Sequence, residues 1–125
     1  MEKLFTLANE DSPSILFDGD IGLIEIKGKS LPEDAIVCYQ PLQLLVKEYI
    51  KSPQQNTTLI FQLEYLNSSS TKKILEIIAL LEELPSQGYQ VEIKWIFKAD
   101  DDDMQEEGEE FMRMTVLPIA LLKEQ

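Results

Sequence analysis

The chain has 125 residues and a formal net charge of -12, from 23 acidic and 11 basic side chains. A chain of this length builds one hydrophobic core, and its acidic surface repels nucleic-acid phosphates and anionic lipids, which excludes both as main partners. Histidine, the commonest general acid or base at neutral pH and the commonest metal ligand, is absent, so a small enzyme is only an alternative function class.

The sequence carries no recognisable targeting or cofactor motif. The first residues lack the long apolar core of a secretory signal, and no apolar run is long enough to span a bilayer, so we expect a cytoplasmic protein without membrane insertion. The glycines do not follow the spacing of a nucleotide-binding loop, and we expect no cofactor. The single thiol, Cys38, lies among apolar residues, which indicates a buried and inert side chain.

The first elements predicted along the chain are a β-hairpin and a helix. Apolar stretches at 15–17 and 23–26 flank an Asp-Gly-Asp turn at 18–20, a pattern typical of antiparallel strands. Pro41 suits the first position of a helix, since its missing amide needs no partner there. Apolar residues at helical spacing follow, so we expect this helix to begin at Pro41 and to stop at 52–53.

A strand, a helix and a second strand are predicted next. Residues 58–66 have apolar groups on both faces, as in an interior strand. The cluster at 67–70 consists of good N-cap residues, and the helix that follows has one apolar face and ends near 85–88. Residues 91–97 alternate as in a strand with one apolar face. This order predicts a right-handed crossover, a parallel strand pair and an α/β fold.

The end of the chain is acidic and then apolar. Residues 100–110 hold eight acidic side chains, whose mutual repulsion predicts an exposed segment, with a weak helix around Met104, Phe111 and Met112 that Gly108 interrupts. Consecutive aspartates lack the spacing of a calcium loop, so we predict no metal site; the segment could still steer the chain towards a basic partner. Pro118 limits the last apolar stretch to an edge strand or an extended tail.

The hydroxyl-rich turn at 67–72 is the main candidate site. A buried strand gives way there to the start of a helix, where free amides and the helix dipole would accommodate an added phosphate. The simpler interpretation, that the hydroxyls only cap the helix, is the one that the local sequence favours. The turn therefore permits a phosphorylation switch without requiring one.

Four stretches, in order along the chain, resemble the SiaC family of bacterial regulatory phosphoproteins. They are Leu-Pro-Glu-Asp at 31–34, Tyr-Gln-Pro-Leu at 39–42, Leu-Glu-Tyr-Leu-Asn with the hydroxyl cluster and Lys at 63–72, and the acidic stretch at 98–111. The resemblance implies one domain over residues 1–125, similar to the STAS domains of anti-sigma-factor antagonists, with a small mixed β-sheet packed with helices.

The resemblance also implies a partner switch. Family members are phosphorylated by a histidine-kinase-like Ser/Thr protein kinase directly after the Tyr-Leu-Asn turn and are reset by a metal-dependent PP2C-type phosphatase. On that pattern the acceptor is Ser68, a position at which the best-known member has Thr, and the alternatives are Ser69, Ser70 and Thr71. The residues expected to bind partners are Asn67, Ser68, Ser69 and Lys72.

The effector is implied by the same resemblance. In the characterised system the unphosphorylated protein binds and activates a diguanylate cyclase, which raises cyclic di-GMP and promotes biofilm formation. A STAS-type anti-sigma-factor antagonist, which would use the same switch on a different partner, is the alternative within this class. Both are non-enzymatic regulators without a catalytic residue of their own.

Overall fold

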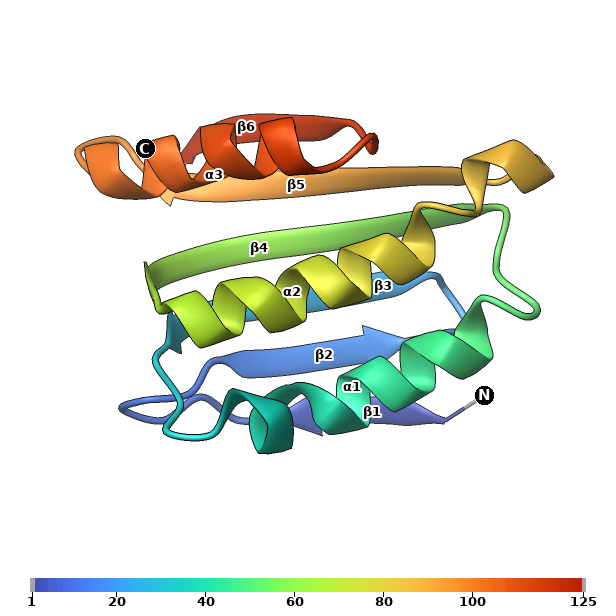
Figure 1. Cartoon of the computed structure of the whole chain (residues 1–125), viewed down its shortest axis with the longest axis horizontal. Helices are drawn as coiled ribbons and strands as arrows, with labels where there is room; N and C mark the ends of the chain where they lie inside the picture. The colour runs from blue at the N-terminus through green and yellow to red at the C-terminus, as the bar shows by residue number, and fades with distance from the viewer. Residues whose placement is uncertain (1, 125) are drawn as a thin grey trace.

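The computed structural model describes residues 2–124, which form a β-sheet with helices packed against it (Figure 1). The strands of this described part are β1 (Lys3–Thr6), β2 (Ser14–Asp18), β3 (Leu23–Ser30), β4 (Asn56–Leu66), β5 (Gln90–Lys98) and β6 (Ile119–Glu124). The helices are α1 (Ala35–Tyr49), α2 (Ser68–Leu81) and α3 (Asp102–Met114), with a short 3-10 helix at Pro85–Gln87.

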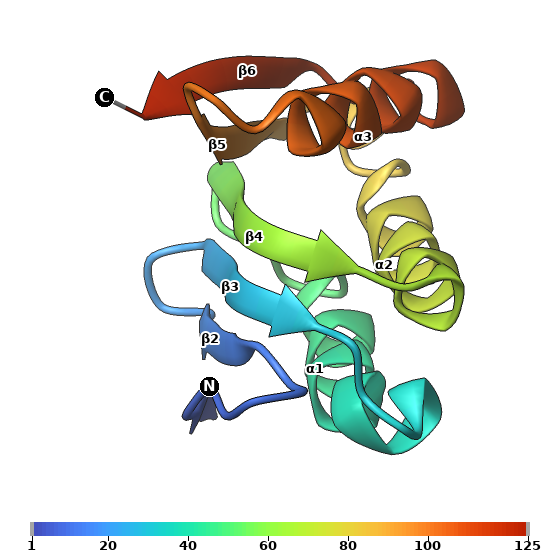
Figure 2. The same cartoon turned by 90° about the vertical axis from the view of Figure 1, so that its left-hand side faces the viewer.

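The sheet is mixed, and its strands lie in sequence order from β1 to β6. β1, β2 and β3 are antiparallel neighbours, whereas β3, β4, β5 and β6 run parallel. Each parallel pair is joined through a helix, and right-handed crossovers between adjacent strands place all three helices on one face, as Figure 2 shows. The predicted hairpin, parallel pair and α/β fold are confirmed, and the three helices begin at the same edge of the sheet.

The hydrophobic core lies between the sheet and these helices. The apolar face of α2 was predicted from its spacing, and Ile74, Ile77, Ile78 and Leu81 are indeed buried. They pack with inward residues of the strands, among them Ile24 and Phe61. Each such side chain contributes about 1.5–3 kcal/mol by leaving water.

The prediction that α1 begins at Pro41 was wrong. The helix begins at Ala35, because Asp34 caps it: its Oδ1 accepts hydrogen bonds from the amides of Ile36 at 3.1 Å and Val37 at 3.2 Å. Pro41 lies inside the helix on its exposed side. The carbonyl that loses its amide partner there belongs to Val37, which is also exposed, so water can satisfy it.

The prediction that Gly108 interrupts the acidic helix was also wrong. α3 is continuous, and it buries Met104, Gly108 and Phe111 against the sheet. A Cβ at Gly108 would lie 2.6 Å from Cδ1 of Trp95 and 2.7 Å from Cδ2 of Leu121, so the glycine allows close packing rather than a break. The Trp95 indole donates to the Met104 carbonyl at 2.9 Å, which fixes the helix on β5.

Other boundaries differ less from expectation. α2 ends at Leu81, before the predicted stop at 85–88, and Leu84 is buried beyond the helix. β6 begins directly after Pro118 and lies at the sheet edge, as predicted. β1 was not predicted from the sequence. Within residues 2–124, no helix is both long enough and apolar enough to pass through a membrane.

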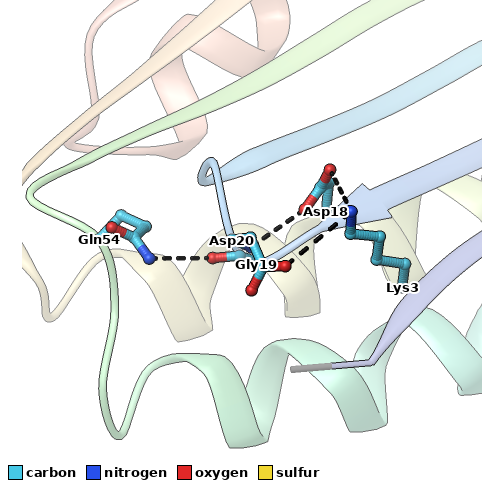
Figure 3. A network of polar contacts seen from close by, with 5 residues as sticks. All are labelled: Lys3, Asp18, Gly19, Asp20 and Gln54. Carbon is cyan, nitrogen blue, oxygen red and sulfur yellow. Dashed lines mark hydrogen bonds and ion pairs between the residues drawn. The ribbon is translucent and has the colours of Figure 1, made fainter.

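A polar network closes the β2–β3 turn (Figure 3). The Asp18 carboxylate accepts from the Asp20 amide at 3.0 Å and lies 3.5 Å from Nζ of Lys3 on β1. The Gly19 carbonyl accepts from Nε2 of Gln54 at 3.4 Å, which ties the turn to the loop between α1 and β4. These carboxylates stabilise a turn at the end of the sheet opposite the start of α2 (Figure 1).

Candidate phosphorylation and docking site

The hydroxyl-rich turn joins the end of β4 to the start of α2. Asn67 is the N-cap: its backbone is extended, and its Oδ1 accepts from the amide of Ser70 at 2.9 Å. The Asn67 amide donates to the carbonyl of Ser30 at 3.0 Å, and its Nδ2 donates to the carbonyl of Pro32 at 3.4 Å. The capping role weighed in the sequence analysis is therefore performed by Asn67.

The four hydroxyls after Asn67 have different surroundings. Ser69 Oγ donates to Asn67 Oδ1 at 3.2 Å, and Thr71 Oγ1 donates back to the Asn67 carbonyl at 3.2 Å. Ser70 is buried, and its Oγ donates to the Ser30 carbonyl at 3.1 Å. Ser68 is exposed, and its hydroxyl makes no hydrogen bond to any residue that the structure describes. The first turn of α2 thus presents one accessible, unengaged hydroxyl.

Lys72 lies one helical turn after Ser68 and is exposed. Its ammonium group has no ion-pair partner within residues 2–124, whereas the neighbouring Lys73 is held by Glu76 at 3.0 Å. Side chains four positions apart lie on the same side of a helix, so Lys72 and Ser68 share one surface. This surface offers a free cation beside a free hydroxyl.

Exposed apolar side chains lie on the neighbouring helix. Ile36, Val37 and Leu44 of α1 are 58%, 66% and 54% exposed, and α1 packs against α2. Leu31, 39% exposed, precedes the Pro32 carbonyl that Asn67 bonds. These exposed residues were not predicted from the sequence. Ile36 and Val37 are in the first turn of α1, which begins at the same edge of the sheet as α2, and exposed apolar area there favours docking of a protein partner.

Two buried residues of the site were also missed. Ser30 and Tyr39 hold the Ser70 side chain through hydroxyl contacts, and burial raises the pKa of Tyr39. The sequence did contain a signal for Ser30, which follows Ile24 and Ile26 in the inward phase of its strand. Ser70 similarly lies four residues before Ile74, on the core face of the helix.

A cleft of about 670 Å³ lies beside the hydroxyl turn, between the ends of β4 and β5 and the start of α3. Its lining includes Tyr65, Lys98, Asp100, Asp103 and Glu107. Across residues 2–124, no group of three or more Cys, Asp or Glu side chains is arranged to hold a metal ion.

A mixed sheet with all three helices on one face, and an accessible hydroxyl turn after the interior strand β4, defines a small α/β domain with a candidate phosphate acceptor. Residues 7–124 match the model of the SiaC family regulatory phosphoprotein, and the chain belongs to this family. An uncharacterised protein of Pseudomonas aeruginosa strain UCBPP-PA14 is 28% identical over 121 residues, which cover 97% of this chain and 96% of that protein.

Solved structures of SiaC from Pseudomonas aeruginosa have the same fold. The structure of the diguanylate cyclase SiaD in complex with its activator SiaC matches with a TM-score of 0.90 at 27% identity, over 97% of this chain and 99% of that chain. Apo-SiaC matches with a TM-score of 0.86 at 28% identity, over 98% and 99% of the two chains. The recognition of the family from sequence motifs is thereby confirmed, and SiaC itself binds a cyclase.

Proposed function

We propose that this chain is a non-enzymatic cytoplasmic regulator that binds and activates a diguanylate cyclase while Ser68 is unphosphorylated. The observation that carries the proposal is the Ser68 hydroxyl, which is exposed and makes no hydrogen bond with residues 2–124, in a turn whose other hydroxyls are engaged. A diguanylate cyclase is proposed as the effector because the chain is similar to SiaC, which occurs in complex with the diguanylate cyclase SiaD. The output is then a rise in cyclic di-GMP and biofilm formation.

Ser68 is the acceptor that requires the least rearrangement. Modification of Ser69 removes its hydrogen bond to the Asn67 cap, and modification of Thr71 removes its bond to the Asn67 carbonyl. Modification of Ser70 requires the core to open, since this residue is 0% exposed. A histidine-kinase-like protein kinase and a PP2C-type phosphatase therefore reach Ser68 without unfolding any part of α2.

Phosphorylation changes the surface rather than the fold. A phosphate adds about -1.5 to -2 charge and three acceptor oxygens. Ser68 is the first residue of α2, and the positive end of a helix stabilises an anion there by about 0.3–1 kcal/mol. Because Ser68 points away from the core, the phosphate displaces no buried group. The domain stays folded in both states.

The partner surface is altered in two ways. An effector that packs against a neutral hydroxyl must instead desolvate the phosphate, and burying an unpaired charge costs more than the roughly 2–7 kcal/mol of an unpaired neutral polar group. The phosphate also attracts the ammonium group of Lys72, one helical turn away, which is then less available to a partner protein. A loss of about 3 kcal/mol corresponds to a more than 100-fold weaker complex.

Three variants test the proposal with the purified cyclase. Ser68→Ala should bind as the unmodified wild type does and should stay bound after treatment with kinase and ATP, whereas Ser68→Asp should bind more weakly. Ser52→Ala is the matched control, because it removes an exposed hydroxyl that lies beyond the end of α1, outside the hydroxyl-rich turn, and should leave the switch intact. Titration calorimetry measures each affinity, and mass spectrometry locates the phosphate.

Two results would oppose the proposal. Equal affinity of Ser68→Ala, Ser68→Asp and the wild type for the cyclase, before and after kinase treatment, would remove Ser68 from the switch. Recovery of an anti-sigma kinase without any cyclase in a pull-down would assign the switch to an anti-sigma-factor antagonist.

A further inference from the structure

Three buried hydroxyls lie beside the acceptor turn. They belong to Ser30 at the end of β3, Tyr39 in α1 and Ser70 in the first turn of α2, and all three residues are 0% exposed. We propose that this hydroxyl chain selects Ser68 as the phosphate acceptor, because it fixes the rotation of the turn that buries Ser70 and presents Ser68. The proposal rests on the function proposed above, since it names the residues that direct modification of that same site.

The three hydroxyls form one directed chain. Ser70 Oγ donates to the Ser30 carbonyl at 3.1 Å, and Ser30 Oγ donates to Ser70 Oγ at 2.8 Å. Because the single hydroxyl proton of Ser30 is used there, Tyr39 is the donor in its 2.5 Å contact with Ser30 Oγ. Every hydroxyl proton of the chain therefore has an acceptor. Burial raises the pKa of Tyr39, which keeps this donor protonated.

The Ser30 carbonyl holds the first turn of α2 at two points. It accepts from the Ser70 hydroxyl and from the backbone amide of Asn67, so both ends of the turn are bonded to one oxygen atom. Each helical residue advances by about 100°, which places Ser68 roughly 200° around the axis from Ser70. The contacts that turn Ser70 into the core therefore turn Ser68 towards solvent.

Loss of this chain weakens the discrimination between neighbouring hydroxyls. Ser30→Ala removes the hydroxyl that donates to Ser70, and Tyr39→Phe removes the donor to Ser30 Oγ. In either variant the chain that holds Ser70 in the core has at least one hydrogen bond fewer, and the first turn opens more often. A hydrogen bond of ordinary net strength, about 1 kcal/mol, corresponds to a roughly fivefold change in such an opening equilibrium. The opened turn offers Ser70 to the kinase along with Ser68, and it frees the hydroxyls of Ser69 and Thr71 from their bonds to Asn67.

α1 supplies a matched control for this test. Tyr49 is buried like Tyr39, and its hydroxyl contacts Oγ1 of the buried Thr57 at 2.7 Å. Tyr49 is the last residue of α1, and this end of the helix lies away from the start of α2 (Figure 1). Tyr39→Phe and Tyr49→Phe therefore remove the same group from the same helix, and only the first affects the acceptor turn.

The experiment compares the wild type with Tyr39→Phe, Ser30→Ala and Tyr49→Phe. Each full chain is incubated with the cognate protein kinase and ATP, and mass spectrometry measures the share of phosphate on each of residues 68–71. Amide hydrogen exchange of the same unmodified proteins measures opening at Ser70 and Thr71. In Tyr39→Phe and Ser30→Ala, the share of phosphate outside Ser68 and the exchange rates should rise about fivefold over the wild type. Tyr49→Phe should match the wild type in both.

The two measurements separate this proposal from the proposed function. If the wild type is modified on Ser68 and the variants show the same site distribution, the selection by the hydroxyl chain is wrong. If Tyr49→Phe changed the site distribution and the exchange rates as much as Tyr39→Phe does, the effect would be a general destabilisation, and the proposed selection would also be wrong. If the wild type is phosphorylated outside residues 67–72, both the proposed function and the selection of Ser68 by the hydroxyl chain are wrong. Amide hydrogen exchange would still show whether the hydroxyl chain holds the turn closed.

Discussion

Removal of the Ser70 hydroxyl should destabilise the protein, whereas removal of the Ser68 hydroxyl should not. The two serines are two residues apart in one helical turn, so the substitutions Ser70→Ala and Ser68→Ala are chemically identical. Ser70 makes two buried hydrogen bonds with Ser30, and Ser68 makes none with residues 2–124. The pair therefore isolates the contribution of the buried contacts.

The magnitude follows from the partner that Ser70→Ala leaves behind. The Ser30 hydroxyl loses its acceptor in a site with 0% exposure, which costs about 1–3 kcal/mol. The Ser30 carbonyl keeps the Asn67 amide as a donor, and alanine is the better helix former by a few tenths of a kcal/mol. The net loss is about 1–2.5 kcal/mol, or roughly 3–10 °C in Tm for a domain of this size. Ser68→Ala should stay within about 0.5 kcal/mol of the wild type.

Urea denaturation followed by circular dichroism measures both variants. The account predicts a lower midpoint for Ser70→Ala with an unchanged m-value and a midpoint for Ser68→Ala close to that of the wild type. If Ser68→Ala lost as much stability as Ser70→Ala, the assignment of one buried and one free hydroxyl would be refuted.

Three further predictions concern the rest of the fold. Gly108→Ala should destabilise the protein by about 1–3 kcal/mol despite the higher helix propensity of alanine, because the new Cβ would overlap Trp95; thermal melting checks this. The pKa of Tyr39 is raised in the folded state, so its contribution to stability is fully present below about pH 10 and is lost as the pH rises further. Urea titrations at alkaline pH should therefore show a smaller difference in unfolding free energy between the wild type and Tyr39→Phe. Pro41→Ala should raise stability by about 1–3 kcal/mol by restoring an amide donor to the Val37 carbonyl, which the urea midpoint would show.

The elements that depend on local pattern could be predicted from the sequence. The spacing of Ile74, Ile77 and Leu81 defines one helical face, and the alternation along β5 defines one strand face, because both patterns reflect burial directly. The start of α1 was missed because only the preference of proline for a first turn was considered, whereas the capping carboxylate of Asp34 determines where the helix begins. Both residues are visible in the sequence, but only Asp34 provides an acceptor for the free amides at the start of the helix.

Tertiary contacts account for the remaining differences. Gly108 looks like a helix break in isolation, and only the packing of Trp95 and Leu121 explains why a residue without a side chain is needed there. Ser30 and Ser70 each lie in the core phase of their own element, but their contact joins residues 40 positions apart. Local periodicity carries no information on such a pairing, so the sequence could not rank Ser68 above its neighbours by physical argument.

Binding of the cyclase by a chain with phosphoserine installed at position 68 tests the central claim most directly. The same preparation, before and after complete dephosphorylation, is titrated into the purified diguanylate cyclase in a calorimeter. The account predicts that the dephosphorylated chain binds and that the Kd of the phosphorylated chain is about 100-fold higher or more. Equal Kd values for the two forms would contradict it.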